Sequence, residues 1–140
     1  MTAVVLGGCA GEGPVSVRPP ADGPAAQPCA ALHRSLPEEL DGRERRETSP
    51  ASQLTTAWGD PAVVLRCGVD RPAALTATSE VLEVDGVEWF LEERPAAFVF
   101  TTVGRTPYVQ VRVPTATPRE RAVAPLVDLA GPVEETLPRG

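Results

Sequence analysis

The residues of this chain whose types could do chemistry are three cysteines and a single histidine. Cys29 and His33 are four positions apart, so a helix would present both side chains on one face, and Cys67 could add a third ligand to a zinc ion. A disulfide between Cys29 and Cys67 is the alternative, favoured by an oxidising exterior and by the lack of a Cys-x-x-Cys pair. The two alternatives require different compartments, and we predict the disulfide, with no metal and no cofactor.

His33 and the carboxylates form no pattern typical of catalysis. Serine catalysis needs the histidine beside a nucleophilic serine and a carboxylate, and no Gly-x-Ser-x-Gly segment occurs. Adjacent glutamates at positions 38–39, 92–93 and 134–135 could act as acid/base pairs, but neighbours in sequence rarely point into one cleft. We therefore interpret the chain as non-enzymatic, and an envelope enzyme with carboxylates in a cleft is the competing hypothesis.

Cys9 stands at the end of a short apolar tract, and Leu6-Gly7-Gly8-Cys9 resembles a bacterial lipobox, in which the cysteine is acylated and becomes the mature N-terminus. A secretory signal needs a charged beginning and about 7–15 apolar residues. Here the apolar stretch is only Ala3 to Leu6, and no basic residue precedes it. We therefore expect the true translation start to lie upstream of Met1. If Met1 is the true start, a cytosolic zinc-binding protein is the alternative.

Length and composition indicate one folded domain after this signal. Residues 10–28 (AGEGPVSVRPPADGPAAQP) lack hydrophobic periodicity and predict an extended tether, which leaves residues 29–140 for the domain. Apolar residues make up 42% of the chain, enough for a core. The net charge of -6 and the lack of a basic stripe argue against nucleic acid as a partner. No apolar run is long enough for a membrane-spanning helix.

The first part of the domain should contain a helix, a loop and a strand. Cys29, Leu32 and Leu36 share one face of a short helix that Pro37 closes. Residues 40–52 (LDGRERRETSPAS) are polar and turn-rich, so we predict a loop. A turn at positions 58–61 (WGDP) leads into a strand at 62–69 (AVVLRCGV), whose alternate side chains lie on opposite faces.

Two hairpins are predicted next. The segment VLEVDGVEW holds two alternating runs joined by Asp85-Gly86, a dipeptide that favours a type I′ turn. A two-residue loop pairs Leu82 with Trp89 on an apolar face and places Glu83 against Glu88 on a solvated one. The runs FVFTTV and YVQVRV form the second hairpin. Its core side should carry Phe98, Phe100, Thr102, Val109, Val111 and Val113.

A C-terminal helix completes the expected fold. Thr117, Pro118 and Glu120 have the spacing of a capping box, and Pro125 and Gly131-Pro132 should kink or break the helix that follows. We predict an α+β fold: an antiparallel sheet of about five strands, with two hairpins, and with the short N-terminal helix and the kinked C-terminal helix on one face.

Three blocks of the sequence, WGDPAVVLRCGV, VDGVEW and GRTPYVQVRVP, resemble a family of actinobacterial lipoproteins known only as a domain of unknown function. The resemblance extends from Cys29 to about Leu137, and the family also has an N-terminal lipobox. It implies a location and a fold but no activity. The implied location is the outer face of the cytoplasmic membrane, with the chain anchored by a lipid on Cys9.

The register of the strands leaves one candidate binding surface. Four side chains should lie opposite the core, namely Arg66, Tyr108, Gln110 and Arg112, with the turn at Trp58 and the loop at Arg105 on the edge. Tyrosine and arginine supply large contact areas and bidentate hydrogen bonds at interfaces. We expect this surface to bind an unknown envelope protein or a cell-wall component.

Overall fold

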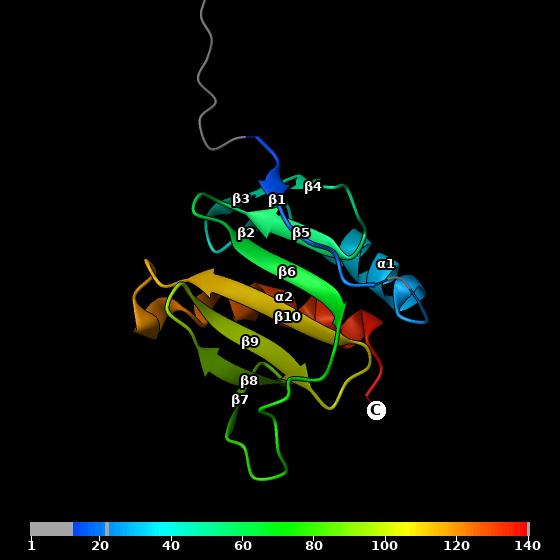
Figure 1. Cartoon of the computed structure of the whole chain (residues 1–140), viewed down its shortest axis with the longest axis vertical. Helices are drawn as coiled ribbons and strands as arrows, with labels where there is room; N and C mark the ends of the chain where they lie inside the picture. The colour runs from blue at the N-terminus through cyan, green and yellow to red at the C-terminus, as the bar shows by residue number, and fades with distance from the viewer. Residues whose placement is uncertain (1–12, 22, 140) are drawn as a thin grey trace, which may run out of the picture.

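An eight-stranded antiparallel sheet forms the centre of the molecule, in the spatial order β2-β3-β5-β6-β10-β9-β8-β7 (Figure 1). The structure is a computed structural model that describes residues 13–21 and 23–139. The strands are β2 (Glu39–Leu40), β3 (Arg43–Arg46), β5 (Thr55–Trp58), β6 (Val63–Val69), β7 (Val81–Val84), β8 (Val87–Glu93), β9 (Ala97–Val103) and β10 (Tyr108–Pro114). The α+β class with a mostly antiparallel sheet is confirmed, whereas the expected count of about five strands is wrong.

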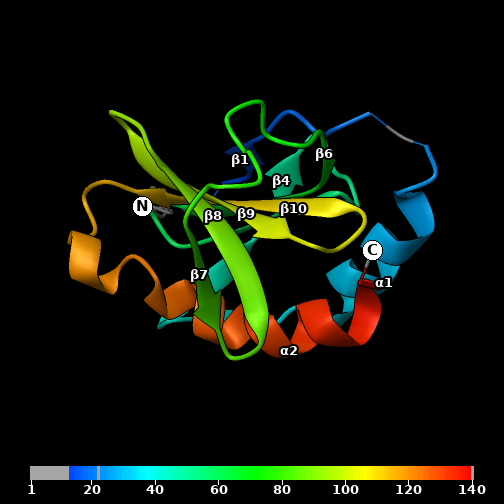
Figure 2. The ribbon, with the colours of Figure 1, turned by 90° about the horizontal axis from the view of Figure 1, so that it is seen from below.

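Both α-helices lie on one side of the sheet, which we call the helix face (Figure 2). They are α1 (Ala26–Ser35) and α2 (Ala124–Thr136), and a 3₁₀ turn, η1 (Arg119–Arg121), precedes α2. The helices contact each other, and their apolar side chains pack on the sheet around Trp58, Trp89 and Phe100, which are fully buried. The opposite side of the sheet is called the outer face below. No helix in the described part of the chain is long and apolar enough to cross a membrane.

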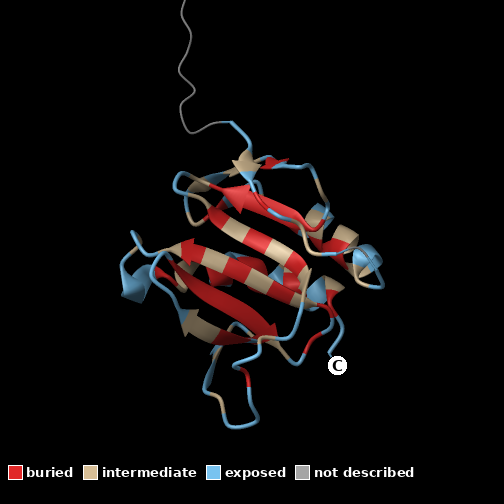
Figure 3. Ribbon diagram, viewed as in Figure 1, coloured by how far each residue is buried: buried red, intermediate tan, exposed pale blue. Residues whose placement is uncertain are grey.

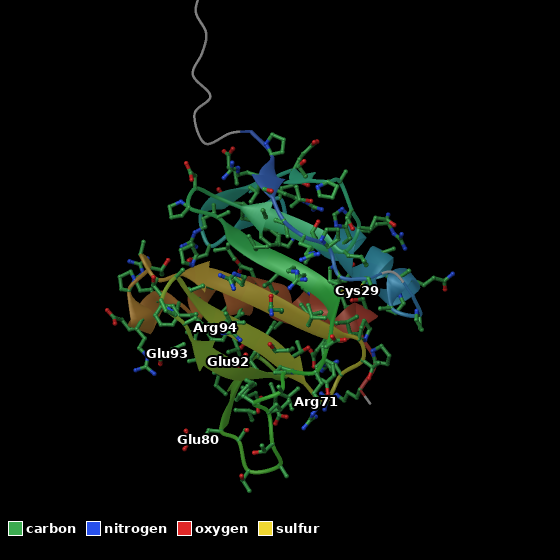
Figure 4. The ribbon with its side chains drawn as sticks, in the orientation of Figure 1. Cys29, Arg71, Glu80, Glu92, Glu93 and Arg94 are labelled. Carbon is green, nitrogen blue, oxygen red and sulfur yellow. A yellow bond between two sulfur atoms is a disulfide. The ribbon has the colours of Figure 1, made fainter. Side chains whose placement is uncertain are left out.

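The first helix is tied to the centre of the sheet by a disulfide between Cys29 on α1 and Cys67 on β6, as predicted. Cys29 is labelled on α1 in Figure 4. Cys29, Leu32 and Leu36 are all buried, which confirms the face expected from their spacing. The bond uses both thiols that the zinc alternative requires. No group of three or more His, Cys, Asp or Glu side chains among the described residues is placed to hold a metal ion.

The loop expected over residues 40–52 is wrong, because this segment contains strands. β2 and β3 form a hairpin whose turn, Asp41-Gly42, has positive φ at both residues. This is the same dipeptide signal that we used at 85–86, hidden here by the charged residues around it. β3 pairs with β5, and the next strand, β4 (Thr48–Ser49), leaves the main sheet and pairs in parallel with β1 (Val15–Ser16).

Residues from the expected tether therefore lie against the domain. The amide of Val15 donates to the carbonyl of Glu47 at 2.8 Å, and that of Val17 donates to Ser49 at 3.1 Å. The side chain of Val17 is buried. Figure 1 shows the segment between β1 and α1 running along β5. Cys9, the expected lipidation site, lies outside the described residues.

Both hairpins have the predicted register. Asp85 and Gly86 have φ values of 50° and 92°, as a type I′ turn requires, and Leu82 lies opposite Trp89 while Glu83 lies opposite Glu88. β9 and β10 pair so that all six expected core residues of the second hairpin are buried. Local turn chemistry and alternation were sufficient here because both act within a few residues.

The capping box at Thr117 is wrong. Pro118 is the N-cap residue of η1, which has no side-chain cap. The Thr117 hydroxyl instead accepts a hydrogen bond from Arg43 Nη2 at 3.3 Å. The helical segment breaks between η1 and α2, so Pro125 lies in the first turn of α2, where a missing N–H costs little. Pro132 lies inside α2 and does not end it.

Candidate functional site

The centre of the outer face carries Arg66 on β6 and Gln110 on β10, which lie directly opposite each other in the sheet. Arg66 Nη1 donates to Gln110 Oε1 at 3.3 Å, and Arg66 Nε donates to the carbonyl of Arg18 at 2.9 Å. Arg112 lies two residues further along β10, on the same face as Gln110. The structure thus brings together three predicted surface residues, and it adds Arg18, which we had assigned to the tether.

The three arginines Arg18, Arg66 and Arg112 form a cluster of positive charge on the outer face. Burial lowers the pKa of the Arg66 guanidinium below its ordinary value, and the positive charges of Arg112 and Arg18 lower it further. Among the described residues, no ion pair includes Arg18, Arg66 or Arg112. The net charge of the chain is -6, so this cluster is a positively charged region of a negatively charged protein.

Tyr108 extends this surface towards the segment that follows β6. Its hydroxyl accepts a hydrogen bond from Arg71 Nη1 at 3.3 Å, and Arg71 Nη2 donates to the carbonyl of Leu75 at 3.0 Å. Arg71 is labelled in Figure 4 on the segment between β6 and β7. Our sequence reasoning missed Arg71, because no local pattern places an arginine of a Pro-containing loop beside a strand 37 residues away.

The outer face is only partly open to solvent. Figure 3 shows alternating buried and half-buried residues along β6 and β10, whereas β9 is buried along nearly its whole length. Val99 and Thr101, which lie opposite Arg112 and Gln110, are each 1% exposed. Around Arg66 the accessible part of this face is therefore a strip over β6 and β10, and Glu83 and Glu88 are exposed on the same face over β7 and β8.

Two residues predicted for the surface do not belong to it. Trp58 is fully buried on the helix face, where its Nε1 donates to the carbonyl of Pro37 at 3.0 Å. Arg105 is 6% exposed, and its Nη1 donates to the carbonyl of Leu137 at 2.9 Å. Trp58 therefore belongs to the core, and Arg105 fastens the β9–β10 turn to the C-terminal end of the chain.

The adjacent glutamates take separate surface partners. Glu92 pairs with Arg94 at 3.3 Å, and Glu93 pairs with Arg119, since neighbouring residues of a strand point to opposite faces. Figure 4 labels these glutamates near one end of the sheet. Glu38 is 89% exposed and lies 3.7 Å from Arg45. Each of these three carboxylates therefore forms an ion pair with an arginine.

A second candidate site is a cavity of about 720 Å³ beside β5, which we call the His33 pocket. Its lining includes His33, Arg45, Arg46, Thr48, Thr55 and Thr56. His33 Nδ1 is hydrogen-bonded to Thr56 Oγ1 at 3.1 Å, and Arg45 Nη2 lies 3.3 Å from His33 Nε2. Burial lowers the pKa of His33, and the charge of Arg45 lowers it further. We missed this pocket because residues 40–52 were expected to be a loop.

Fold and site together define a disulfide-linked α+β domain with two helices on one face of an antiparallel sheet and an arginine cluster on the other. A family model described as Protein of unknown function (DUF3515) matches residues 1–140, and the chain belongs to this family. The expected membership of a family of unknown function is thereby confirmed. No curated protein and no solved structure matches the chain.

Proposed function

We propose that this chain is a non-enzymatic binding module of the cell envelope, anchored by a lipid on Cys9 at the outer face of the cytoplasmic membrane, and that its outer face binds an anionic cell-wall component. The observation that carries the proposal is the arginine cluster of Arg18, Arg66 and Arg112, which has no carboxylate partner among the described residues. Guanidinium groups match the geometry of phosphate and carboxylate groups, so an anionic polymer would supply the missing charge.

The architecture supports a role for this cluster beyond folding. Like charges held close together destabilise a fold, and the positive charges of Arg112 and Arg18 add to the effect of burial, which lowers the pKa of Arg66 most. The β6–β10 strip places Arg66 and Arg112 near Gln110, whose amide can offer both a donor and an acceptor, and Arg18 adjoins Arg66. A flat charged strip suits an extended polymer better than a small molecule.

Binding can be tested with a double variant and a matched control. The variant Arg66→Gln/Arg112→Gln removes two charges from the outer face, whereas Arg34→Gln/Arg139→Gln removes two exposed charges elsewhere. We expect the first variant to bind a poly(glycerol phosphate) chain at least about tenfold more weakly, which is roughly 1.4 kcal/mol, and the control to bind as the parent does. Equal losses in both variants, or no loss in either, would overturn the proposal. Crosslinking in cells that recovers only a protein through this face would replace the polymer with a protein partner.

The anchor needs a separate test. The gene should be expressed in its own host with its upstream sequence, and the mass of the mature N-terminus measured. We expect Cys9 to carry a diacyl group, because a single acyl chain holds a protein to a membrane only marginally. A mature protein that retains Met1 and an unmodified Cys9 would refute the anchor.

A further inference from the structure

The His33 pocket exists because β3 and β5 separate. β3 pairs with β5 only at Trp58 and Ala57. After Arg46 the chain turns away into β4, which pairs with β1. Thr55 and Thr56, the first half of β5, are left without a neighbour from β3, and they line the pocket. The topology of the sheet therefore opens the cavity, and the segment between β4 and β5 forms one of its walls.

Two guanidinium groups line this pocket, and Arg45 forms an ion pair at 3.7 Å with the exposed carboxylate of Glu38, whereas no ion pair among the described residues includes Arg46. Arg45 Nη1 donates to the carbonyl of Leu36 at 3.2 Å. Arg46 donates to the carbonyls of Gly59 and Gly13, in both cases at 2.7 Å. Carbonyl groups hold a guanidinium in place without neutralising it. Arg46 Nε is buried and has no partner among the described residues. The carboxylates on the rim, Glu38 and Glu47, are both exposed to solvent.

The remaining polar groups of the lining are neutral. Thr48 and Thr55 share a hydrogen bond between their hydroxyls at 2.7 Å, Thr56 bonds to His33, and Ser52 and Gln53 complete one wall. Hydroxyl and amide groups can both donate and accept, which suits a ligand that carries hydroxyl groups. Among the described residues, no tryptophan, tyrosine or phenylalanine lines the cavity, so a sugar ring has no aromatic side chain to stack against.

From this arrangement we infer that the His33 pocket binds a small phosphorylated or carboxylated polyol, of which glycerol phosphate is the simplest member. Arg45 and Arg46 would hold the anionic group, and Ser52 and Gln53, which are less buried than the threonines, would bond to the hydroxyl groups. The volume of about 720 Å³ exceeds what glycerol phosphate alone would fill, so a larger ligand with the same group also fits.

The position of the pocket indicates two sources for such a group. Arg46 bonds to Gly13, so the pocket adjoins the point where the chain enters the domain. If Cys9 carries a lipid, as the proposed function holds, four Cα–Cα steps of about 3.8 Å place Gly13 within about 15 Å of the anchor. A phospholipid headgroup is then as reachable as a free metabolite.

His33 provides the readout, because it is the only histidine in the chain. Its imidazole resonances can be followed by NMR while inorganic phosphate, glycerol 3-phosphate or neutral glycerol is added. We expect a saturable shift with the two anions and none with glycerol. Arg45→Gln should weaken binding at least about tenfold. The control is Arg43→Gln in the same strand, whose guanidinium pairs with Asp41 outside the pocket.

A second variant guards against a folding defect in Arg45→Gln. Gln53→Met keeps much of the side-chain shape but removes an amide group from the pocket wall, and it should weaken the binding of glycerol 3-phosphate more than that of inorganic phosphate. No saturable shift with either anion, or equal losses in Arg43→Gln and Arg45→Gln, would overturn the inference.

Experiments with lipid vesicles distinguish a phospholipid headgroup from a soluble ligand. Binding of the parent to phosphatidylglycerol vesicles but not to phosphatidylcholine vesicles, lost in Arg45→Gln, would assign a headgroup. Binding of free glycerol 3-phosphate without vesicle binding would assign a soluble ligand. These variants leave Arg66 and Arg112 intact, so failure here and failure of polymer binding at the outer face are distinguishable.

Discussion

Arg45 Nη2 lies 3.3 Å from His33 Nε2, and this contact defines the protonation state of the histidine. Arginine has donors and no acceptor, so Nε2 must be the accepting nitrogen, and the neutral ring carries its proton on Nδ1, which donates to Thr56 Oγ1. Protonation of Nε2 would place two donors and two positive charges against each other. Burial and this neighbour both lower the pKa of His33.

The lowered pKa predicts how stability depends on pH. In the window between the folded pKa and the ordinary value of 6.5, the unfolded chain binds more protons than the folded one. The contribution of His33 to the free energy of unfolding is therefore fully present above pH 6.5, and it is lost as the pH falls through that window. Urea unfolding from about pH 7.5 to 5 should show a larger loss in the parent than in His33→Gln. Parallel pH profiles in the two proteins would contradict this prediction.

The disulfide between Cys29 and Cys67 should contribute strongly to stability. It closes a loop with a sequence separation of 38, for which the chain-entropy model gives about 4 kcal/mol. We expect the double variant Cys29→Ala/Cys67→Ala to lose roughly this free energy of unfolding, measured with urea. The parent under reducing conditions should approach the same midpoint. Two free thiols in protein isolated under oxidising conditions would show that the bond does not form.

Arg105 and Arg139 both approach Glu134, at 3.7 and 3.6 Å, but differ in burial. Arg105 is buried and also holds the carbonyl of Leu137, whereas Arg139 is exposed. Arg105→Gln should therefore lower the free energy of unfolding by about 1.5–3 kcal/mol, the range for a buried hydrogen bond to a charged group. Arg139→Gln should change it by less than about 0.5 kcal/mol. Similar losses in both would mean that the ion pair, and not the buried bond, stabilises this end of the fold.

Removal of one charge from the outer face should not harm the fold. Arg112→Gln relieves repulsion of Arg66, so at low salt we expect the free energy of unfolding to stay the same or rise by up to about 0.5 kcal/mol. The effect should vanish in 1 M salt, where the screening length is about 3 Å. Arg34→Gln, on the exposed side of α1, serves as the control. A clear loss of stability would mean that Arg112 has a structural partner.

Local chemistry allowed much of the core to be predicted from the sequence. The Asp85-Gly86 turn favours positive φ, and a two-residue loop leaves a single register for the strands beside it. Alternation along β9 and β10 then assigned their core side chains, and the spacing of Cys29, Leu32 and Leu36 assigned the buried face of α1. Each of these features depends on residues a few positions apart.

The tertiary structure decided which residues, far apart in the sequence, lie side by side. Arg66 gained Arg18 as a neighbour, and the Thr117 hydroxyl accepts a hydrogen bond from Arg43. The His33 pocket combines segments from α1, β3 and β5. Short polar strands such as β3 carry little apolar pattern, because pairing with β5 and not burial of their own side chains keeps them in the sheet. Trp58 and Arg105 are buried with their polar groups satisfied, because distant carbonyl groups at Pro37 and Leu137 accept their hydrogen bonds. Such partners leave no trace in the nearby sequence, since a polar group can be buried wherever the folded chain supplies an acceptor.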